Sequence, residues 1–217
     1  MPLSFNTLLP SGARIWIWDV QETIEEVQKF IDDEDFLEIC KIYHHPQRRL
    51  QKAITRILLN KLGAGKKVDI QYDGYGKPMP DTLPGSISIS HSKHFVGLLY
   101  HPVHACGLDL EEPDQRVLRI AHRFLNDLEK AWIRPVEQLP DTCLVWSTKE
   151  ALFKNIGGGG ILFKDQLVVH EPTYINEQHG YGTAVYSGKT GPTAFDYHFD
   201  YLEGVLMVHT IAKESDL

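Results

Sequence analysis

The sequence has few cysteines and no long apolar run, and both absences narrow the class of protein. Its three cysteines, Cys40, Cys106 and Cys143, lie far apart and form no CxxC pair, so neither a disulfide framework nor a zinc ribbon is indicated. No stretch approaches the roughly 18 apolar residues of a membrane-spanning helix, and the first residues lack the pattern of an export signal. We therefore expect a cytoplasmic protein with reduced thiols and no membrane partner.

Positive charge is also in deficit. The chain carries 22 Lys and Arg against 29 Asp and Glu, for a formal net charge of −7. This balance argues against a nucleic-acid-binding surface, and a polyanionic ligand would need a local cluster of Lys and Arg. Hydrophobic residues make up 42% of the 217 residues and charged residues 24%, as in an ordinary globular protein.

The first half of the chain predicts a strand, then helices, then three strands. Apolar residues run from Ile15 to Trp18, and helical spacing follows from Ile24 onward. A long helix is expected after Pro46, with an apolar face that ends at Gly63. Three short strands then begin near Val68, Ser86 and Phe95, separated by turn-forming residues.

The second half repeats this order of elements. The segment ACGLDLE predicts a strand, helical spacing runs from Val117 to Leu125, and a helix from about Leu144 must stop at the glycines 157–160. Four further strands are expected: Leu167 to Val169, Gly182 to Tyr186, Phe195 to Tyr201 and Val205 to Ile211. We therefore predict an α+β protein of two similar halves, residues 1–102 and 103–217.

Two acidic side chains share one face of the GLDLE strand. Because side chains alternate along a strand, Asp109 and Glu111 project to the same side while Leu110 points into the core. Paired carboxylates suit a hard cation that prefers oxygen ligands, and Glu112 is close enough in sequence to assist. The alternative is that these acids face solvent or pair with arginines.

The segment WSTKEALFK carries an acid and a base one helical turn apart. Glu150 and Lys154 are four residues apart and share a helix face with Trp146. Such a pair can act together on one phosphate group, or it can form an ordinary helical ion pair.

A third segment places further polar groups near a strand end. Lys77 follows a turn in YGKP, and Ser90 and His91 lie in ISHS at the end of the SISIS strand. These groups can contact phosphate oxygens. The alternative is a surface turn followed by a histidine satisfied within the core.

Taken in order, GKP, ISHS, GLDLE and WSTKEALFK resemble the 4′-phosphopantetheinyl transferase superfamily, in its larger, surfactin-synthetase-activating type. The resemblance runs from Arg48 to about Gly160. It implies Mg²⁺-dependent transfer of the phosphopantetheine arm of coenzyme A to a serine of an apo carrier protein, with release of adenosine 3′,5′-bisphosphate. It also implies a monomeric pseudo-dimer of two α+β halves with the active site in the cleft between them.

The resemblance assigns roles to individual residues. Asp109, Glu111 and Glu150 match the metal-binding acids, and Glu150 is also the group expected to help deprotonate the carrier serine. Lys154 matches a lysine beside the scissile pyrophosphate. The expected coenzyme A contacts are Arg48 or Arg49, Lys77, Ser90, His91, Lys149 and Lys154, with His91 at the 3′-phosphate. Ser88 departs from the pattern, because the family commonly has asparagine there.

The protein partner is expected to be an acyl or peptidyl carrier. Arg116, Arg119 and Arg123 form a basic stripe opposite the apolar face of their helix, and carrier proteins are typically acidic around their modified serine. A solvated helix face is the alternative. The sequence leaves open which biosynthetic pathway is served and whether Mn²⁺ replaces Mg²⁺.

Two other functions are compatible with parts of the pattern. A metal-dependent nuclease or phosphatase would use the three acids but would leave GKP, ISHS and the spacing of Lys154 unexplained. A non-catalytic module that binds carriers through the basic stripe would not need the acids at all.

Overall fold

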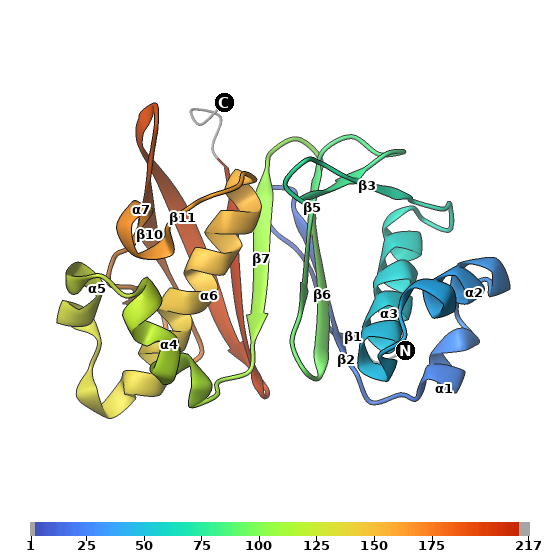
Figure 1. The fold of residues 1–217 in the computed structure, drawn as a ribbon, viewed down its shortest axis with the longest axis horizontal. Coiled ribbons are helices and arrows are strands. Elements are labelled where there is room, and N and C mark those ends of the chain that lie inside the picture. The colour runs from blue at the N-terminus through green and yellow to red at the C-terminus, as the bar shows by residue number, and fades with distance from the viewer. Residues whose placement is uncertain (1–2, 213–217) are drawn as a thin grey trace.

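The computed structural model describes residues 3–212, and it forms two α+β halves side by side (Figure 1). The N-terminal half contains a four-stranded antiparallel sheet in the order β1-β2-β6-β5. Three helices and the small sheet β3-β4 complete this half. Its elements are β1 (Leu3–Leu8), β2 (Arg14–Asp19), α1 (Ile24–Gln28), α2 (Asp33–Ile42), α3 (Pro46–Leu62), β3 (Ile70–Tyr72), β4 (Pro78–Pro80), β5 (Ser86–His91) and β6 (Phe95–His101).

The C-terminal half is built on an antiparallel sheet of six strands. Its order is β7-β12-β11-β10-β8, with β9 paired to β10, and α6 crosses one face (Figure 1). Its elements are β7 (Cys106–Glu111), α4 (Arg116–Phe124), α5 (Asp127–Trp132), the 3₁₀ turn Pro135–Glu137, α6 (Gln138–Ile156), α7 (Phe163–Gln166), β8 (Leu167–Val169), β9 (Thr173–Tyr174), β10 (His179–Gly188), β11 (Gly191–Leu202) and β12 (Val205–Ile211).

The predicted α+β class is confirmed, and the main helices and strands lie where the sequence pattern placed them. α3 ends at Leu62 before Gly63, and α6 ends before Gly157, whose φ of +61° favours glycine. The sequence pattern did not predict β1, β4, α5, α7 or β9. α5 begins with a capping box between Asn126 and Glu129, a signal that the sequence contains.

The connection between the halves runs from β6, which ends at His101, to β7, which begins at Cys106 in the other sheet. The boundary at residue 102 and the pseudo-dimer relationship remain predictions. Among residues 3–212, no helix combines the length and apolar character needed to cross a membrane.

The SISIS pattern explains how the two halves are joined. Ile87 and Ile89 of β5 pack on α3, so the alternating serines face β7. Ser88 Oγ accepts a hydrogen bond from Leu108 N at 2.9 Å, and Ser90 Oγ accepts one from Leu110 N at 3.1 Å. Serine hydroxyls therefore satisfy the β7 backbone where a neighbouring strand would otherwise pair with it.

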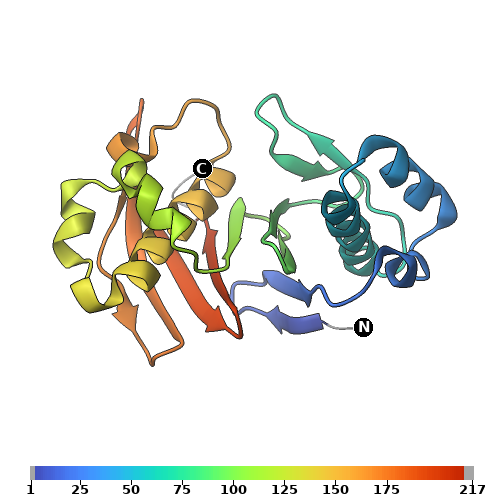
Figure 2. The same ribbon diagram turned by 60° about the horizontal axis from the view of Figure 1, so that its bottom comes forward.

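Three buried clusters hold the layers together. One lies between α3 and the N-terminal sheet, and one between α6 and the C-terminal sheet. The third joins the two sheets, with Ile15, Ile17 and Leu99 against Leu108 and Met207. Figure 2 shows β7 between the two halves. We call the line of hydrogen bonds between the β5 serines and β7 the polar seam. The third cluster thus forms a continuous apolar contact behind this seam.

Candidate active site

Asp109 is the centre of the polar seam. Its carboxylate is buried and accepts hydrogen bonds from Lys154 Nζ at 2.7 Å and Ser90 Oγ at 3.0 Å on Oδ1, and from Ser147 Oγ at 2.7 Å on Oδ2. Lys154 also donates to Leu108 O at 2.9 Å. These contacts fix one acid and one lysine between β5, β7 and α6.

Glu111 and Glu150 lie close to Asp109 and to each other. Burial, and then the Asp109 carboxylate, raise the pKa of Glu150 to about 7. The pKa of Glu111 also rises to about 7, by burial and then Asp109, with Glu150 contributing further. The structure therefore brings the three predicted acids into one electrostatic group, in which ionisation of each disfavours ionisation of the others.

The chemistry of this group fits a hard divalent ion. Carboxylate oxygens are the ligands that Mg²⁺ prefers, and a cation would relieve the mutual repulsion that raises both glutamate pKa values. Within residues 3–212, however, no three or more His, Cys, Asp or Glu side chains are already arranged to hold a metal ion. The two oxygens of Asp109 accept hydrogen bonds from protein groups instead. A shared metal therefore remains a prediction.

Glu112 lies beside Glu111 and contributes to its raised pKa, but its carboxylate is engaged by other partners. Its Oε1 accepts from Ser92 Oγ and His94 N, both at 2.7 Å, and its Oε2 lies 2.7 Å from His94 Nδ1. These contacts hold the turn between β5 and β6.

On one side of the seam, a cavity of about 590 Å³ collects predicted residues from both halves. Arg48 of α3, His91 of β5 and Glu111 of β7 line it together with Arg116 of α4. The cavity therefore places two arginines and an imidazole beside the acidic group.

The His91 ring is oriented by a hydrogen bond to Thr55. Thr55 gives its one hydroxyl hydrogen to Gln51 O at 2.8 Å, so His91 Nε2, 3.1 Å from Thr55 Oγ1, acts as the donor. Burial and then Lys52 lower the pKa of His91 to about 3. The ring is therefore neutral at pH 7 and sits in a positive field.

On the other side of the seam, Lys77 and Lys154 line a smaller cavity of about 170 Å³ between the halves. Lys77 Nζ donates to Asn155 O at 2.6 Å, and burial lowers the pKa of this lysine. Lys77 reaches across from the N-terminal half and meets the last turn of α6, as the turn in GKP allows. The two predicted lysines are thus brought together.

The structure separates Arg48 from Arg49. Arg48 lines the cavity with His91, whereas Arg49 Nε donates to Tyr43 O at 3.2 Å at the end of α2. The predicted contact from Ser90 also changes, because the residue is only 4% exposed and its hydroxyl is engaged by Leu110 N, Asp109 and Lys154. Ser90 acts within the seam instead of at its surface.

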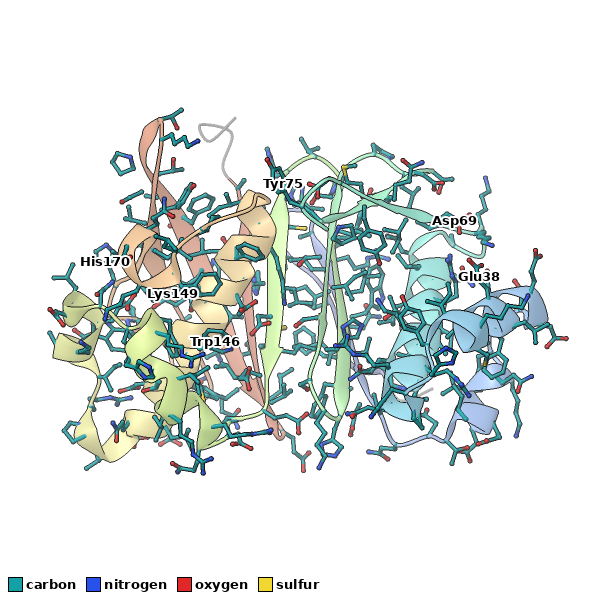
Figure 3. The ribbon with its side chains drawn as sticks, in the orientation of Figure 1. Glu38, Asp69, Tyr75, Trp146, Lys149 and His170 are labelled. Carbon is teal, nitrogen blue, oxygen red and sulfur yellow. The ribbon has the colours of Figure 1, made fainter. Side chains whose placement is uncertain are left out.

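Lys149 requires a correction. It is fully buried, and its Nζ contacts Glu129 Oε1 at 2.8 Å, Phe124 O at 2.6 Å and Phe163 O at 2.8 Å. Figure 3 shows Lys149 on the side of α6 that faces α5 and α7. Lys149 and Lys154 are five positions apart, so their side chains point to different faces of the helix. The structure therefore contradicts the prediction that Lys149 contacts coenzyme A.

Sequence reasoning missed two residues of the site. Ser147, fully buried, donates to Asp109 Oδ2. Lys52, half-buried, is the largest charged contributor to the lowered pKa of His91. The signal for Lys52 was its position four residues after Arg48 on the same face of α3. Ser147 gave no sequence signal. It is an uncharged residue three positions before Glu150, and its spacing alone does not predict a contact with Asp109.

The three acids of the seam and Lys154 fall within a segment that has known relatives. Residues 105–199 match the family model of the 4′-phosphopantetheinyl transferase superfamily. This segment is similar to members of that superfamily. A curated relative, 4′-phosphopantetheinyl transferase gsp of Aneurinibacillus migulanus, is 32% identical over 90 residues, which cover 39% of this chain and 36% of the relative. The match thus spans little more than a third of the relative's length.

The superfamily segment contains one part of the site, and the fold supplies the other. Asp109, Glu111, Glu150 and Lys154 lie within residues 105–199. Arg48, Lys77 and His91 lie outside them and reach the segment through the seam and its two cavities. The resemblance predicted from the sequence motifs is confirmed for the superfamily, whereas the roles of individual residues remain predictions.

Proposed function

We propose that this protein transfers the 4′-phosphopantetheine arm of coenzyme A to a serine of an apo carrier protein and releases adenosine 3′,5′-bisphosphate. The observation that carries the proposal is the convergence of the superfamily segment's Asp109 and Lys154 with cations from the other half. Coenzyme A carries a pyrophosphate and a 3′-phosphate, so its binding requires several cations at fixed separations.

The two cavities suit different phosphates of coenzyme A. We assign the 3′-phosphate to Arg48 and His91, with Lys52 adding positive charge from the next turn of α3. Because Nε2 of the neutral His91 ring donates to Thr55, Nδ1 is an acceptor, and a contact with phosphate requires a second proton on Nδ1. A bound phosphate would favour that proton by opposing the burial and the positive neighbours that lower the pKa of His91.

Lys77 and Lys154 are assigned to the pyrophosphate. Both line the smaller cavity, and the Asp109 carboxylate orients Lys154 through a 2.7 Å ion pair. A fixed ammonium group can stabilise the charge that develops on the departing phosphate, and a preorganised charge needs little rearrangement during the reaction. Positioning of this kind supplies much of the catalysis in phosphoryl-type transfer.

Asp109, Glu111 and Glu150 would hold Mg²⁺, with Mn²⁺ as an alternative ion. When bound, such an ion supplies electrostatic stabilisation of the phosphate oxygens. Glu150 is also proposed to take the proton of the carrier serine, directly or through water, because it is the half-exposed acid on the α6 face that carries Lys154.

The carrier protein is proposed to dock on α4. Arg116, Arg119 and Arg123 are exposed along this helix, and Arg116 pairs with Asp114 at 3.1 Å. Arg116 also lines the cavity of His91 and Glu111, so the stripe starts at the site. An acidic partner on this helix would present its serine at the edge of the seam.

The deciding experiment incubates the protein with coenzyme A, Mg²⁺ and several apo carriers and measures intact carrier mass. The expected result is addition of one phosphopantetheine group, its loss on chelation of divalent ions, and its recovery when Mg²⁺ is restored. If folded protein with metal modifies no carrier but cleaves nucleic acid or phosphate esters, the transferase proposal fails. Binding of carriers without modification would indicate a non-catalytic module.

A further inference from the structure

A third cavity, of about 590 Å³, lies on the face of the C-terminal sheet that points away from α6. Strand register explains the placement. His198 of β11 pairs with His209 of β12, which pairs with Leu108 of β7, so all three side chains project to one face. Asp109, the next residue of β7, projects to the opposite face. This cavity is therefore separate from the candidate active site.

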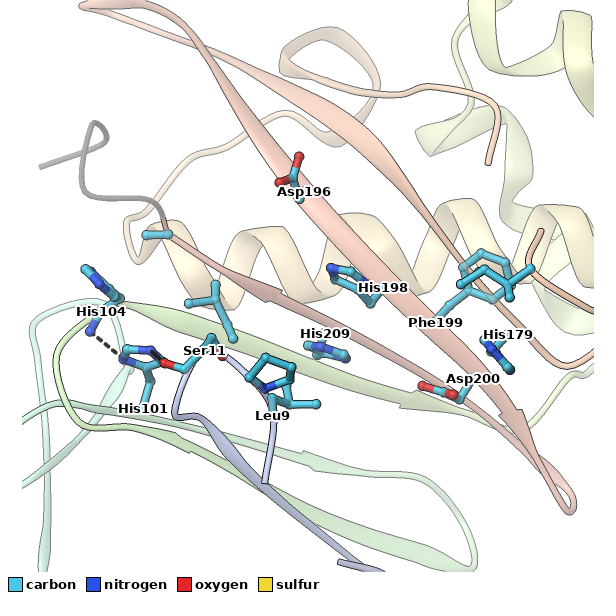
Figure 4. A pocket seen from close by; sticks show the side chains of 15 residues that line it. Leu9, Ser11, His101, His104, His179, Asp196, His198, Phe199, Asp200 and His209 are labelled. Atoms are coloured by element: carbon cyan, nitrogen blue, oxygen red, sulfur yellow. Dashed lines mark hydrogen bonds between the residues drawn. The ribbon is translucent and has the colours of Figure 1, made fainter. Parts of the chain in front are cut away.

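The cavity lies between this sheet face and the N-terminal half. The β1–β2 hairpin closes one side with Leu9 and Ser11, and the connection between β6 and β7 closes another with His101 and His104 (Figure 4). The first half of the chain thus covers β12. It leaves β11 uncovered on this face, where His198 is exposed to solvent.

His209 is a buried polar side chain without a partner. It is 5% exposed and lines the cavity, and its Nδ1 makes no hydrogen bond. Burial, and then His198, lower the pKa of His209 to about 3, so the ring is neutral at pH 7. An unsatisfied buried polar atom costs free energy in the folded state. A ligand that donates a hydrogen bond to Nδ1 would remove this cost.

The histidines at the other end divide into one that is satisfied and one that is not. His101 Nε2 lies 3.0 Å from Ser11 O, and its Nδ1 accepts from His104 N at 2.7 Å and Val103 N at 3.1 Å. Its tautomer is therefore fixed, and its role is structural. His104 packs on this ring at 4.8 Å between centroids, and its buried Nδ1 has no partner.

Shape and charge indicate the chemistry of a ligand. The His198 and His209 rings are stacked, with centroids 5.3 Å apart and planes 15° from parallel, so the pair presents a row of aromatic ring edges. Asp196 and Asp200 flank His198 on the same face, and no Lys or Arg is among the described residues that line the cavity. This field disfavours anions and favours a cation or a hydrogen-bond donor.

We propose that this cavity binds a small planar aromatic ligand that carries an amine or amidine group. The ring packs across the edges of the stacked His198 and His209 rings, and the nitrogen group donates hydrogen bonds to Asp200 and to His209 Nδ1. A cavity of about 590 Å³ is within the usual size of small-molecule sites. The site is independent of the transferase proposal, because its residues face away from Asp109.

The test uses benzamidine as the probe, with the isosteric benzoate and benzamide as comparisons. Histidine ring signals of the full chain are followed by NMR during titration at pH 7.5. We expect saturable shifts of the His209 and His198 signals, with benzamidine binding at least about fivefold tighter than benzoate. Equal shifts with benzoate, or no saturation with any probe, would overturn the proposal.

Two variants locate the site. Asp200→Asn removes the carboxylate from a half-buried position. His209→Phe keeps an aromatic side chain and removes Nδ1. Each should weaken benzamidine binding about three- to tenfold, while His170→Phe, an exposed histidine away from the cavity, should not. Unchanged affinity in Asp200→Asn contradicts the site even if His209→Phe fails to fold.

Discussion

Asp109 shows how single contacts define the candidate site. Its carboxylate is held by Ser90 of β5 and by Ser147 and Lys154 of α6. A buried carboxylate is retained only where such donors compensate its lost hydration. Glu150 lacks this degree of compensation, which is why its pKa rises to about 7. Removing the charge of Glu150 should therefore affect function more than stability.

Glu150→Gln should reduce carrier modification by at least about a hundredfold, because it removes a proton acceptor and a metal-binding oxygen. Its thermal transition at pH 8 should be unchanged or higher, because burial and Asp109 disfavour the ionised side chain in the folded protein. Modification rate and thermal unfolding are measured side by side, with the exposed Glu203→Gln as the control. A large drop in melting temperature would assign Glu150 a structural role.

His209 should make stability depend on pH. Its folded pKa of about 3 lies below its ordinary value of 6.5, so the unfolded chain binds the proton more readily. The stabilisation is present above about pH 6.5 and is lost as pH falls toward 3. Relative to His209→Phe, the wild type should lose about 1.4 kcal/mol per pH unit in that window.

Urea unfolding of both proteins between pH 7 and pH 4.5 checks this prediction. The neighbouring groups that titrate, including His198, are present in both proteins, so the difference isolates His209. A difference that does not change with pH would mean that His209 is solvated when protonated. His170→Phe, which alters an exposed ring, should follow the wild type.

At the scale of elements, α6 serves two purposes on two faces. One face presents Glu150 and Lys154 to the seam, and another buries Lys149 against α5 and α7. Glu129 completes the buried pair and also accepts from Val169 N at 2.9 Å, which ties α5 to β8. The ion pair and its hydrogen bonds therefore join four helices, α4, α5, α6 and α7, to the sheet behind the candidate active-site face.

Lys149→Met should destabilise the protein by about 3–5 kcal/mol, because it leaves Glu129 buried without a counter-charge. The double variant Lys149→Met/Glu129→Gln should recover part of this loss. The KM for coenzyme A should stay unchanged at a temperature where the variant is folded. Urea unfolding and steady-state kinetics test both points, with the exposed Lys130→Met as the control. A raised KM in a stable variant would restore Lys149 as a ligand contact.

At the scale of the whole molecule, an acidic chain concentrates cations where its halves meet. The net charge is −7, yet Arg48, Lys52 and Lys154 all act on His91. The exposed arginines of α4 extend this positive region outward. Such a field attracts an acidic partner in solution and falls off with added salt.

Arg119→Glu combined with Arg123→Glu should raise the carrier KM at least about tenfold, while the KM for coenzyme A changes little. The reason is that both side chains are exposed on α4, and neither lines the two candidate coenzyme A cavities. The effect should shrink as salt is added. The matched control is Lys61→Glu, a reversal on the last turn of α3. An unchanged carrier KM would remove α4 from the docking surface.

The sequence by itself determined the main elements and the inventory of chemical groups. Alternation placed Asp109 and Glu111 on one strand face, helical spacing paired Glu150 with Lys154, and glycines ended α3 and α6. These are local rules, set by backbone geometry and by residues close in the chain. Short motifs also revealed the resemblance to the superfamily.

Tertiary structure decided which of these groups meet. Sequence alone did not distinguish Arg48 from Arg49 or Lys154 from Lys149, because periodicity shows which side chains share a face and not what the face packs against. Contact between β5 and β7 set that choice by bringing Ser90 to Asp109 and the cations of α3 to Glu111. The same packing of two sheets enclosed His209, whose environment depends on residues about 100 positions or more away.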